Sequence, residues 1–226
     1  MSERREEGIV LKSTPFKDAD RIVTVFTPNQ GVLSFIVKRL SKNRPAMVNL
    51  TTPLCRGEFI FKTGRSQLHR FIDGTILDLH LPLRQSYERL DYGAKMLSAI
   101  LTSQMPGKSA PSLYALLITY LKHLGNFPLP IALWASFQLK ILKHEGLLAI
   151  DTTCLACQQA SASRLVEGES RCVKCSDALS FPFAQKEWET LLLLFHTKQF
   201  KALLDLEISP SLIQGIEALY NSRLGT

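Results

Sequence analysis

The sequence contains no uninterrupted apolar run close to the roughly 20 residues that a membrane-spanning helix needs. Its longest apolar runs are short, such as residues 191–195. Residues 1–7 carry charges of both signs, and no apolar segment of the kind found in signal peptides follows them. These absences argue against a membrane protein or a membrane partner, and we expect the protein in the cytoplasm.

The signature motifs of common enzyme classes are also missing. The chain has no G-x-G-x-x-G, H-E-x-x-H or G-x-S-x-G pattern. Gly107-Lys108-Ser109 resembles the end of a phosphate-binding loop, but the first glycine of that loop would fall on Thr102, and Pro111 follows too soon for the helix that must come next. None of the five histidines has a glutamate two residues later, as a zinc deaminase requires. We therefore expect no catalytic residues and no enzyme.

Positive charge is concentrated in part of the chain. Lysine and arginine total 27 against 20 aspartates and glutamates, a formal net charge of +7. Residues 1–80 carry 13 basic and 8 acidic side chains and residues 81–150 carry 7 and 3, whereas residues 151–226 carry 7 and 9. If the protein binds a polyanion such as DNA, the N-terminal two-thirds is the part that binds it, although many basic proteins bind no nucleic acid.

The first 80 residues read as short strands separated by turns. Apolar and β-branched residues predict strands over 8–14, 21–27, 31–38, 53–63 and 68–78. Five short strands in so few residues indicate a small, strongly curved sheet, for which an OB-type barrel is the commonest solution. An SH3-like barrel is the alternative, and the pattern alone does not separate the two.

After Pro82 the apolar spacing changes to that of helices. The first helix is expected to bury a stripe of residues at three- and four-residue spacing: Leu83, Tyr87, Leu90, Ala94, Leu97 and Leu101. A second helix is expected from Pro111, at its first turn, to a C-terminal Gly125. A third is expected over 131–144, buried on all sides and closed by Gly146.

Two further helices are predicted over 185–196 and 209–223, the second with Ser209 as its N-cap. The fold class is thus α+β, an N-terminal barrel followed by an α-helical domain. We expect domain 1 to cover residues 1–80 and domain 2 to cover residues 81–226, with a polar, cysteine-bearing insertion at 151–180.

Four of the five cysteines form the pattern CxxC–x14–CxxC, with Cys154, Cys157, Cys172 and Cys175. Each CxxC places two sulfurs on one tight turn, and two such turns supply four thiolates to one tetrahedral ion, which suits Zn²⁺. Four thiolates leave no position for water or substrate, so the zinc is expected to be structural. Two disulfides, a redox pair and an iron–sulfur cluster are the alternatives. Cys55 stands alone and is expected to be a small buried residue.

Basic residues cluster in the predicted barrel near the faces that OB folds use for nucleic acid, strands two and three and the loop between strands four and five. The candidate DNA-binding residues are Arg21, Lys38, Arg39, Lys42, Arg44, Arg65 and Arg70. They would contact phosphates without reading sequence. Phe35, Phe59, Phe61 and Phe71 are interleaved with them, and each is expected in the core rather than stacked on a base.

The order of these features resembles the RecO family of bacterial recombination mediators. The resemblance is carried in the barrel by residues 7–12, Phe16, Asp20, Ile22, Val23, Phe26-Thr27, Gly31 and Val37-Lys38-Arg39. In the helical part it is carried by Phe137, Lys140, Leu142 and Gly146, which lead into Cys154-x2-Cys157.

The resemblance implies a nucleoid-associated protein of DNA repair and recombination that binds single- and double-stranded DNA and anneals complementary strands. It also implies complexes with RecR and with the acidic, apolar C-terminal tail of single-stranded DNA-binding protein, through which RecA is loaded. Candidate tail-binding residues are Lys122, Lys140, Lys143 and Lys198. Two alternatives without annealing activity are a zinc-ribbon adaptor that binds only proteins and an RNA-binding OB protein.

Overall fold

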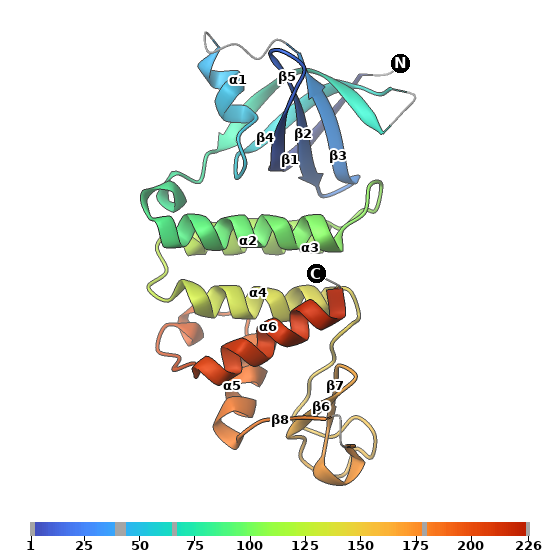
Figure 1. The fold of residues 1–226 in the computed structure, drawn as a ribbon, viewed down its shortest axis with the longest axis vertical. Coiled ribbons are helices and arrows are strands. Elements are labelled where there is room, and N and C mark those ends of the chain that lie inside the picture. Colours follow the sequence, from blue (N-terminus) through green and yellow to red (C-terminus); the bar gives the residue numbers. More distant parts are fainter. Residues whose placement is uncertain (1–2, 39–43, 65–66, 178–179, 225–226) are drawn as a thin grey trace. The chain divides into compact units, whose positions relative to one another are not determined.

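A computed structural model describes residues 3–38, 44–64, 67–177 and 180–224 (Figure 1). By their internal contacts, the residues group into two compact units, Met1–Asn126 and Phe127–Thr226. The two helices that follow the barrel therefore share a contact unit with it. The domain boundary expected at residue 80 stays a prediction.

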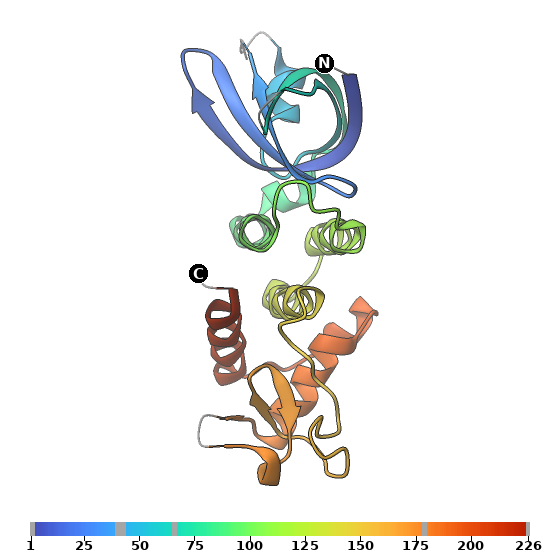
Figure 2. The same ribbon diagram turned by 90° about the vertical axis from the view of Figure 1, so that its right-hand side faces the viewer.

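The N-terminal strands form a closed five-stranded barrel, whose curvature is visible in Figure 2. Its strands are β1 (Glu3–Phe16), β2 (Asp20–Thr27), β3 (Gly31–Val37), β4 (Arg56–Lys62) and β5 (Leu68–Asp78). The order around the barrel is β1-β2-β3-β5-β4, and the β3–β5 pair that completes it is parallel. This closure is that of an OB-type barrel and resolves the choice against the SH3-like alternative. The predicted strands are confirmed, although β1 begins earlier and β4 is shorter than expected.

The barrel core is built on aromatic rings. Phe35, Phe59 and Phe61 are each at most 1% exposed, and the Phe35 ring lies 4.8 Å from that of Phe61 and 5.7 Å from that of Phe59. Val23 and Val25, which alternate with outward residues of β2, pack in the same cluster. Phe71 is only partly buried against this core. The expectation that these phenylalanines pack rather than stack on bases is confirmed for the first three.

A short helix, α1 (Pro45–Leu50), connects β3 to β4 and was not predicted from the sequence. Leu50 is buried against two glycines of the sheet. A Cβ atom added at Gly57 would lie 2.5 Å from a Leu50 methyl group, and one added at Gly74 would lie 2.8 Å from the other. These glycines therefore leave the space in which α1 docks on the barrel.

The first unit continues with a 3-10 turn, η1 (Leu81–Gln85), and the helices α2 (Tyr87–Ser103) and α3 (Pro111–Leu124). The stripe predicted for the first helix is wrong at Tyr87, Leu90 and Ala94, whereas Leu83, which lies in η1, and Leu97 are buried as expected. Tyr87 is 87% exposed and Ala94 also faces solvent. The buried face is centred instead on Gly93, Met96, Leu97, Ala99 and Ile100. Gly93 lies on this buried face, where a Cβ atom would be at ordinary contact distance, 3.4–3.5 Å, from Leu54 and Leu83.

The end of α3 also differs from expectation. Pro111 occupies the first turn as predicted, but Gly125 has φ −55° and is not a left-handed cap. Its lack of a side chain serves packing, because a Cβ atom there would lie 3.0 Å from Pro82. The sequence did not distinguish these two roles, since a glycine after a helix can either form a left-handed cap or make room for a neighbouring side chain.

The second unit contains α4 (Pro130–His144), α5 (Gln185–His196), η3 (Phe200–Leu203) and α6 (Pro210–Leu224). As predicted, α4 is almost wholly buried, and Gly146 follows it with φ +72°. Ser209 caps α6, because its Oγ accepts a hydrogen bond from the Leu212 N–H at 3.2 Å. Within the described ranges, no helix is long and apolar enough to cross a membrane.

Between α4 and α5 lies the cysteine-bearing insertion. It contains β6 (Arg164–Val166), β7 (Glu169–Arg171), the 3-10 turn η2 (Val173–Cys175) and β8 (Phe181–Pro182). The strands form a small antiparallel sheet in the order β7-β6-β8. The insertion is therefore an ordered hairpin structure rather than an open loop.

Candidate nucleic-acid interface and metal centre

Three of the predicted DNA-binding residues line one hollow at the rim of the barrel, of about 190 Å³. Lys38 follows the last residue of β3, Arg44 precedes α1, and Arg70 lies on β5, directly across the parallel pair from Ile36. All three side chains are exposed. The rest of the lining is apolar: Val37, Met47, Phe71 and Ile72. We call this site the barrel hollow.

The remaining predicted DNA-binding residues are distributed differently. Arg21 pairs with Val37 across β2 and β3, next to Lys38, but it is half-buried and its guanidinium donates a hydrogen bond to Ser13 Oγ at 3.3 Å. Three more candidates, Arg39, Lys42 and Arg65, lie outside the described residues.

Sequence reasoning missed a further cation beside the hollow. Lys62 pairs with Arg70 across β4 and β5, and residues directly opposite in an antiparallel pair point to the same face. Both side chains are exposed. By contrast, Arg5 and Arg56 of the same barrel form ion pairs with Glu58 and Glu7. The strand register of β4 and β5 would have identified Lys62, but that register is not readable from charge alone.

The four clustered cysteines form a candidate metal centre. Their Sγ atoms all lie within 4.8 Å of one another, and those of Cys157 and Cys172 are 4.0 Å apart. Sulfurs about 2.3 Å from a tetrahedral zinc ion lie about 3.8 Å apart, so this donor set fits such an ion with small adjustments. The two sulfurs of each pair come from one turn, which is closed by the Gln158 N–H to the Cys154 carbonyl and by the Cys175 N–H to the Cys172 carbonyl.

The lowered pKa of one of these thiols also favours binding of a cation. A hydrogen bond from the Cys157 backbone N–H lowers the pKa of Cys154 to about 6, so this sulfur is a thiolate at neutral pH. Hydrogen bonds with the sulfurs of Cys172 and Cys157 raise the pKa of Cys175 to about 12. At neutral pH a thiolate at Cys154 thus lies beside a protonated thiol at Cys175, and a bound cation would displace the remaining thiol protons.

The environment of Cys55 differs from that of the cluster. Its side chain is fully buried in the barrel core, as predicted, and burial raises the pKa of its thiol to about 11. It is therefore a small packing residue with an unreactive, protonated thiol.

Three of the four candidate tail-binding lysines come together in the second unit. Lys140 Nζ donates to the Phe195 and Thr197 carbonyls at the end of α5, at 3.2 and 2.7 Å. Lys143 Nζ lies 4.5 Å from the centre of the Phe195 ring. Burial, followed by the charges of Lys143 and Lys198, lowers the pKa of Lys140 to about 8. Lys122 is exposed on α3, in the first unit.

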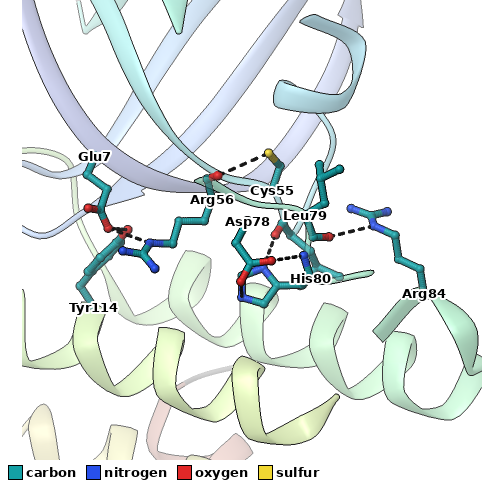
Figure 3. A network of polar contacts seen from close by, with 9 residues as sticks. Glu7, Cys55, Arg56, Asp78, Leu79, His80, Arg84 and Tyr114 are labelled. Atoms are coloured by element: carbon teal, nitrogen blue, oxygen red, sulfur yellow. Dashed lines mark hydrogen bonds and ion pairs between the residues drawn. The ribbon is translucent and has the colours of Figure 1, made fainter. Parts of the chain in front are cut away.

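A polar network fastens the barrel to the helix α3 (Figure 3). Glu7 Oε1 on β1 accepts hydrogen bonds from Arg56 Nε of β4 at 2.8 Å and from the Tyr114 hydroxyl of α3 at 2.9 Å. Burial opposes ionisation of Glu7, but these hydrogen bonds prevail and lower its pKa. On the same side of the barrel, the buried His80 has Nδ1 2.8 Å from the Leu54 carbonyl.

Comparison with known proteins agrees with the order of these features. Residues 1–80 match the family description "Recombination protein O N terminal", and residues 84–224 match "Recombination protein O C terminal". A DNA repair protein RecO of Chlamydia muridarum is 28% identical over 221 residues, which cover 96% of this chain and 94% of the relative. A DNA repair protein RecO of Moorella thermoacetica is 33% identical over 153 residues, 68% of this chain and 57% of the relative. The chain belongs to the RecO family.

Proposed function

We propose that this protein is a mediator of DNA repair and recombination that binds single- and double-stranded DNA and anneals complementary strands. In this role it helps RecA to load onto single-stranded DNA coated by single-stranded DNA-binding protein, and it acts by binding, without a catalytic step. The observation that carries the proposal is the convergence of Lys38, Arg44 and Arg70 at the barrel hollow of a chain of the RecO family.

The barrel hollow suits a phosphate backbone because its cations are exposed and come from three separate segments. A strand that crosses the rim meets more than one of them, and each phosphate contact releases condensed counterions. The resulting affinity falls steeply with salt and does not depend on base sequence. Such binding leaves the pairing edges of the bases free, as annealing requires.

The four cysteines would hold a structural Zn²⁺ that links the two turns of the insertion. The ion supplies positive charge that neutralises the thiolates, together with a crosslink between residues far apart in the sequence. Because all four donors are cysteines, no position is left for substrate. Within this proposal the metal shapes the second unit and takes no part in contacts with DNA.

The proposal includes two protein partners that follow from family membership: RecR and the C-terminal tail of single-stranded DNA-binding protein. For the acidic, apolar tail, we propose the end of α5. The exposed Lys143 has its Nζ 4.5 Å from the centre of the buried Phe195 ring, and the exposed Lys198 follows the helix. Lys140 is better regarded as a helix cap, because it already donates to two carbonyl groups of that end.

The central experiment measures annealing of complementary oligonucleotides coated with single-stranded DNA-binding protein, by fluorescence, with and without this protein. We expect acceleration by the wild type and its loss in the variant Lys38→Glu/Arg70→Glu. Lys201→Glu, an exposed charge reversal on η3, is the matched control and should leave the rate unchanged.

The same preparation separates the alternatives. A protein-binding adaptor would show no affinity for single-stranded DNA at moderate salt, and an RNA-binding protein would prefer RNA to DNA of equal length. No acceleration by folded, zinc-loaded protein would refute the mediator role.

The tail site is tested by binding of a labelled acidic tail peptide. We expect charge reversal of Lys143 and Lys198 together to weaken binding, whereas reversal of Lys122, on α3, tests the fourth candidate separately. Unchanged affinity in both variants would refute the proposed site.

A further inference from the structure

The barrel hollow combines its cations with a smaller apolar wall, which phosphate binding alone does not require. Its wall is formed by Phe71 and Ile72 of β5 and by Met47 of α1. Ile72 is 41% exposed, although it belongs to a strand of the barrel. Single exposed apolar side chains are common on protein surfaces, so the relevant observation is the position of Ile72 among three cations and not its exposure alone.

The strand register shows how Ile72 reaches this position. On β4, Ile60 and Phe61 are consecutive, but their partners on β5 are Asp73 and Phe71, so Ile72 is the extra residue of a β-bulge. Bulges bend a strand and redirect a side chain, and they are frequent next to binding sites. Phe71 remains anchored in the core, with its ring 6.4 Å from that of Phe59, so the wall of the hollow has a fixed base.

We propose that the barrel hollow binds one unpaired base of single-stranded DNA, with the base against its apolar wall and the flanking phosphates on its three cations. The inference rests on the proposed DNA-binding function and specifies which form of DNA this site selects. At about 190 Å³ the hollow is smaller than the roughly 300–1,000 Å³ of typical ligand pockets, a size that suits a fragment such as one base. In a duplex, the faces of the bases are covered by their neighbours, and exposing one costs a few kcal/mol.

Strand β5 contains its own matched control. A second register shift, between Arg56 and Gly57 on β4, leaves Leu77 as the extra residue on β5. Leu77 is 47% exposed, similar to Ile72, but it does not line the barrel hollow. Truncation of either side chain removes a similar apolar surface from a bulge of the same strand, and only Ile72 lies among the cations.

The test compares two single strands of about 16 nucleotides, within the site sizes of OB folds, one of thymidines and one of the same length without bases. Fluorescence anisotropy at fixed salt gives the ratio of their affinities. We expect the wild type to prefer the strand with bases by about 10-fold, which corresponds to about 1.4 kcal/mol and is close to the free energy of burial of one aliphatic side chain. Ile72→Ala and Ile72→Thr should reduce this ratio to about 2-fold, while Leu77→Ala keeps it. Affinity for a duplex of equal length should not change in any of these variants.

The outcomes distinguish this inference from the function on which it rests. Equal affinity of the wild type for the two strands, or an unchanged ratio in both Ile72 variants, would overturn the base pocket while salt-dependent DNA binding remained. Absence of any salt-dependent binding to DNA would instead overturn the proposed function. A similar loss of the ratio in Leu77→Ala would assign the effect to general disturbance of β5 and also overturn the pocket.

Discussion

Removal of the metal from the four-cysteine centre is expected to unfold the insertion while leaving the barrel intact. The perturbation is chelation, or the replacement of Cys175 by serine, which removes one donor at the exposed edge of the cluster. The barrel has its own core of buried phenylalanines and valines in the first unit. The insertion has no comparable core, and this difference sets the magnitude of the effect.

Leu165 is the single large apolar side chain buried between residues 151 and 177, a range that the structure describes throughout. Burial of one leucine contributes about 1.5–3 kcal/mol. That is no more than the conformational entropy lost when about two residues are ordered. A structural zinc site contributes about 10–16 kcal/mol of binding free energy, so the ion is the main source of order in this segment.

Amide hydrogen exchange measures this directly. The Leu155 N–H is bonded to the Ser170 carbonyl and the Cys154 N–H to the Ala160 carbonyl, and both should lose protection on chelation. Amides of the barrel pairs, such as those between β2 and β3, should keep theirs. Retained protection at Leu155 and Cys154 in metal-free, reduced protein would refute the argument, because it would show that the polar insertion is ordered by its own contacts.

Three further predictions concern charges and hydrogen bonds. Reversal of Lys38 and Arg70 together should weaken binding to both single strands and duplexes and reduce the slope of log affinity against log salt by roughly 1.5 to 2, as measured by salt titration. Tyr114→Phe should lower the free energy of unfolding by about 1–2 kcal/mol at neutral pH in denaturant titrations. Because folding lowers the pKa of Glu7, ionised Glu7 stabilises the folded state above its unfolded pKa, and this stabilisation is lost as the pH falls through its folded pKa. The effect of Tyr114→Phe should therefore shrink in acid. Folding lowers the pKa of Lys140 to about 8, so between that pH and the ordinary lysine pKa the unfolded chain binds more protons than the folded one. The free energy of unfolding of the wild type should therefore rise with pH over this range, and that of Lys140→Met should not.

The features predicted correctly from the sequence are those encoded by local pattern. Alternation along β2 and β3 places Val23, Val25 and Phe35 inward, and the spacing of the cysteines brings four sulfurs within reach of one ion. The capping hydroxyl of Ser209 is equally local, because the group that it satisfies lies three residues away. Each of these depends on residues that are close in sequence or on one repeated spacing.

The errors arise where a distant residue decides the outcome. The stripe expected for α2 has helical spacing, but the face that is buried includes Gly93, which lies against Leu54 and Leu83 from outside the helix. The six residues of α1 are too few for a periodic pattern, and the helix is held by Leu50 against two glycines of other strands. Gly125 is explained by Pro82, more than forty residues earlier in the chain.

In the candidate interface, too, some features are encoded locally and others depend on residues far apart in the sequence. Lys38 and Arg70 could be nominated from composition, but their proximity depends on the parallel contact between β3 and β5 that closes the barrel. The exposure of Ile72 depends on a bulge that only the pairing register reveals. A mediator of annealing has to hold a strand firmly while its pairing edges stay free. Cations on the phosphates and an apolar side chain against the face of a base meet both demands, because neither occupies a hydrogen-bonding edge.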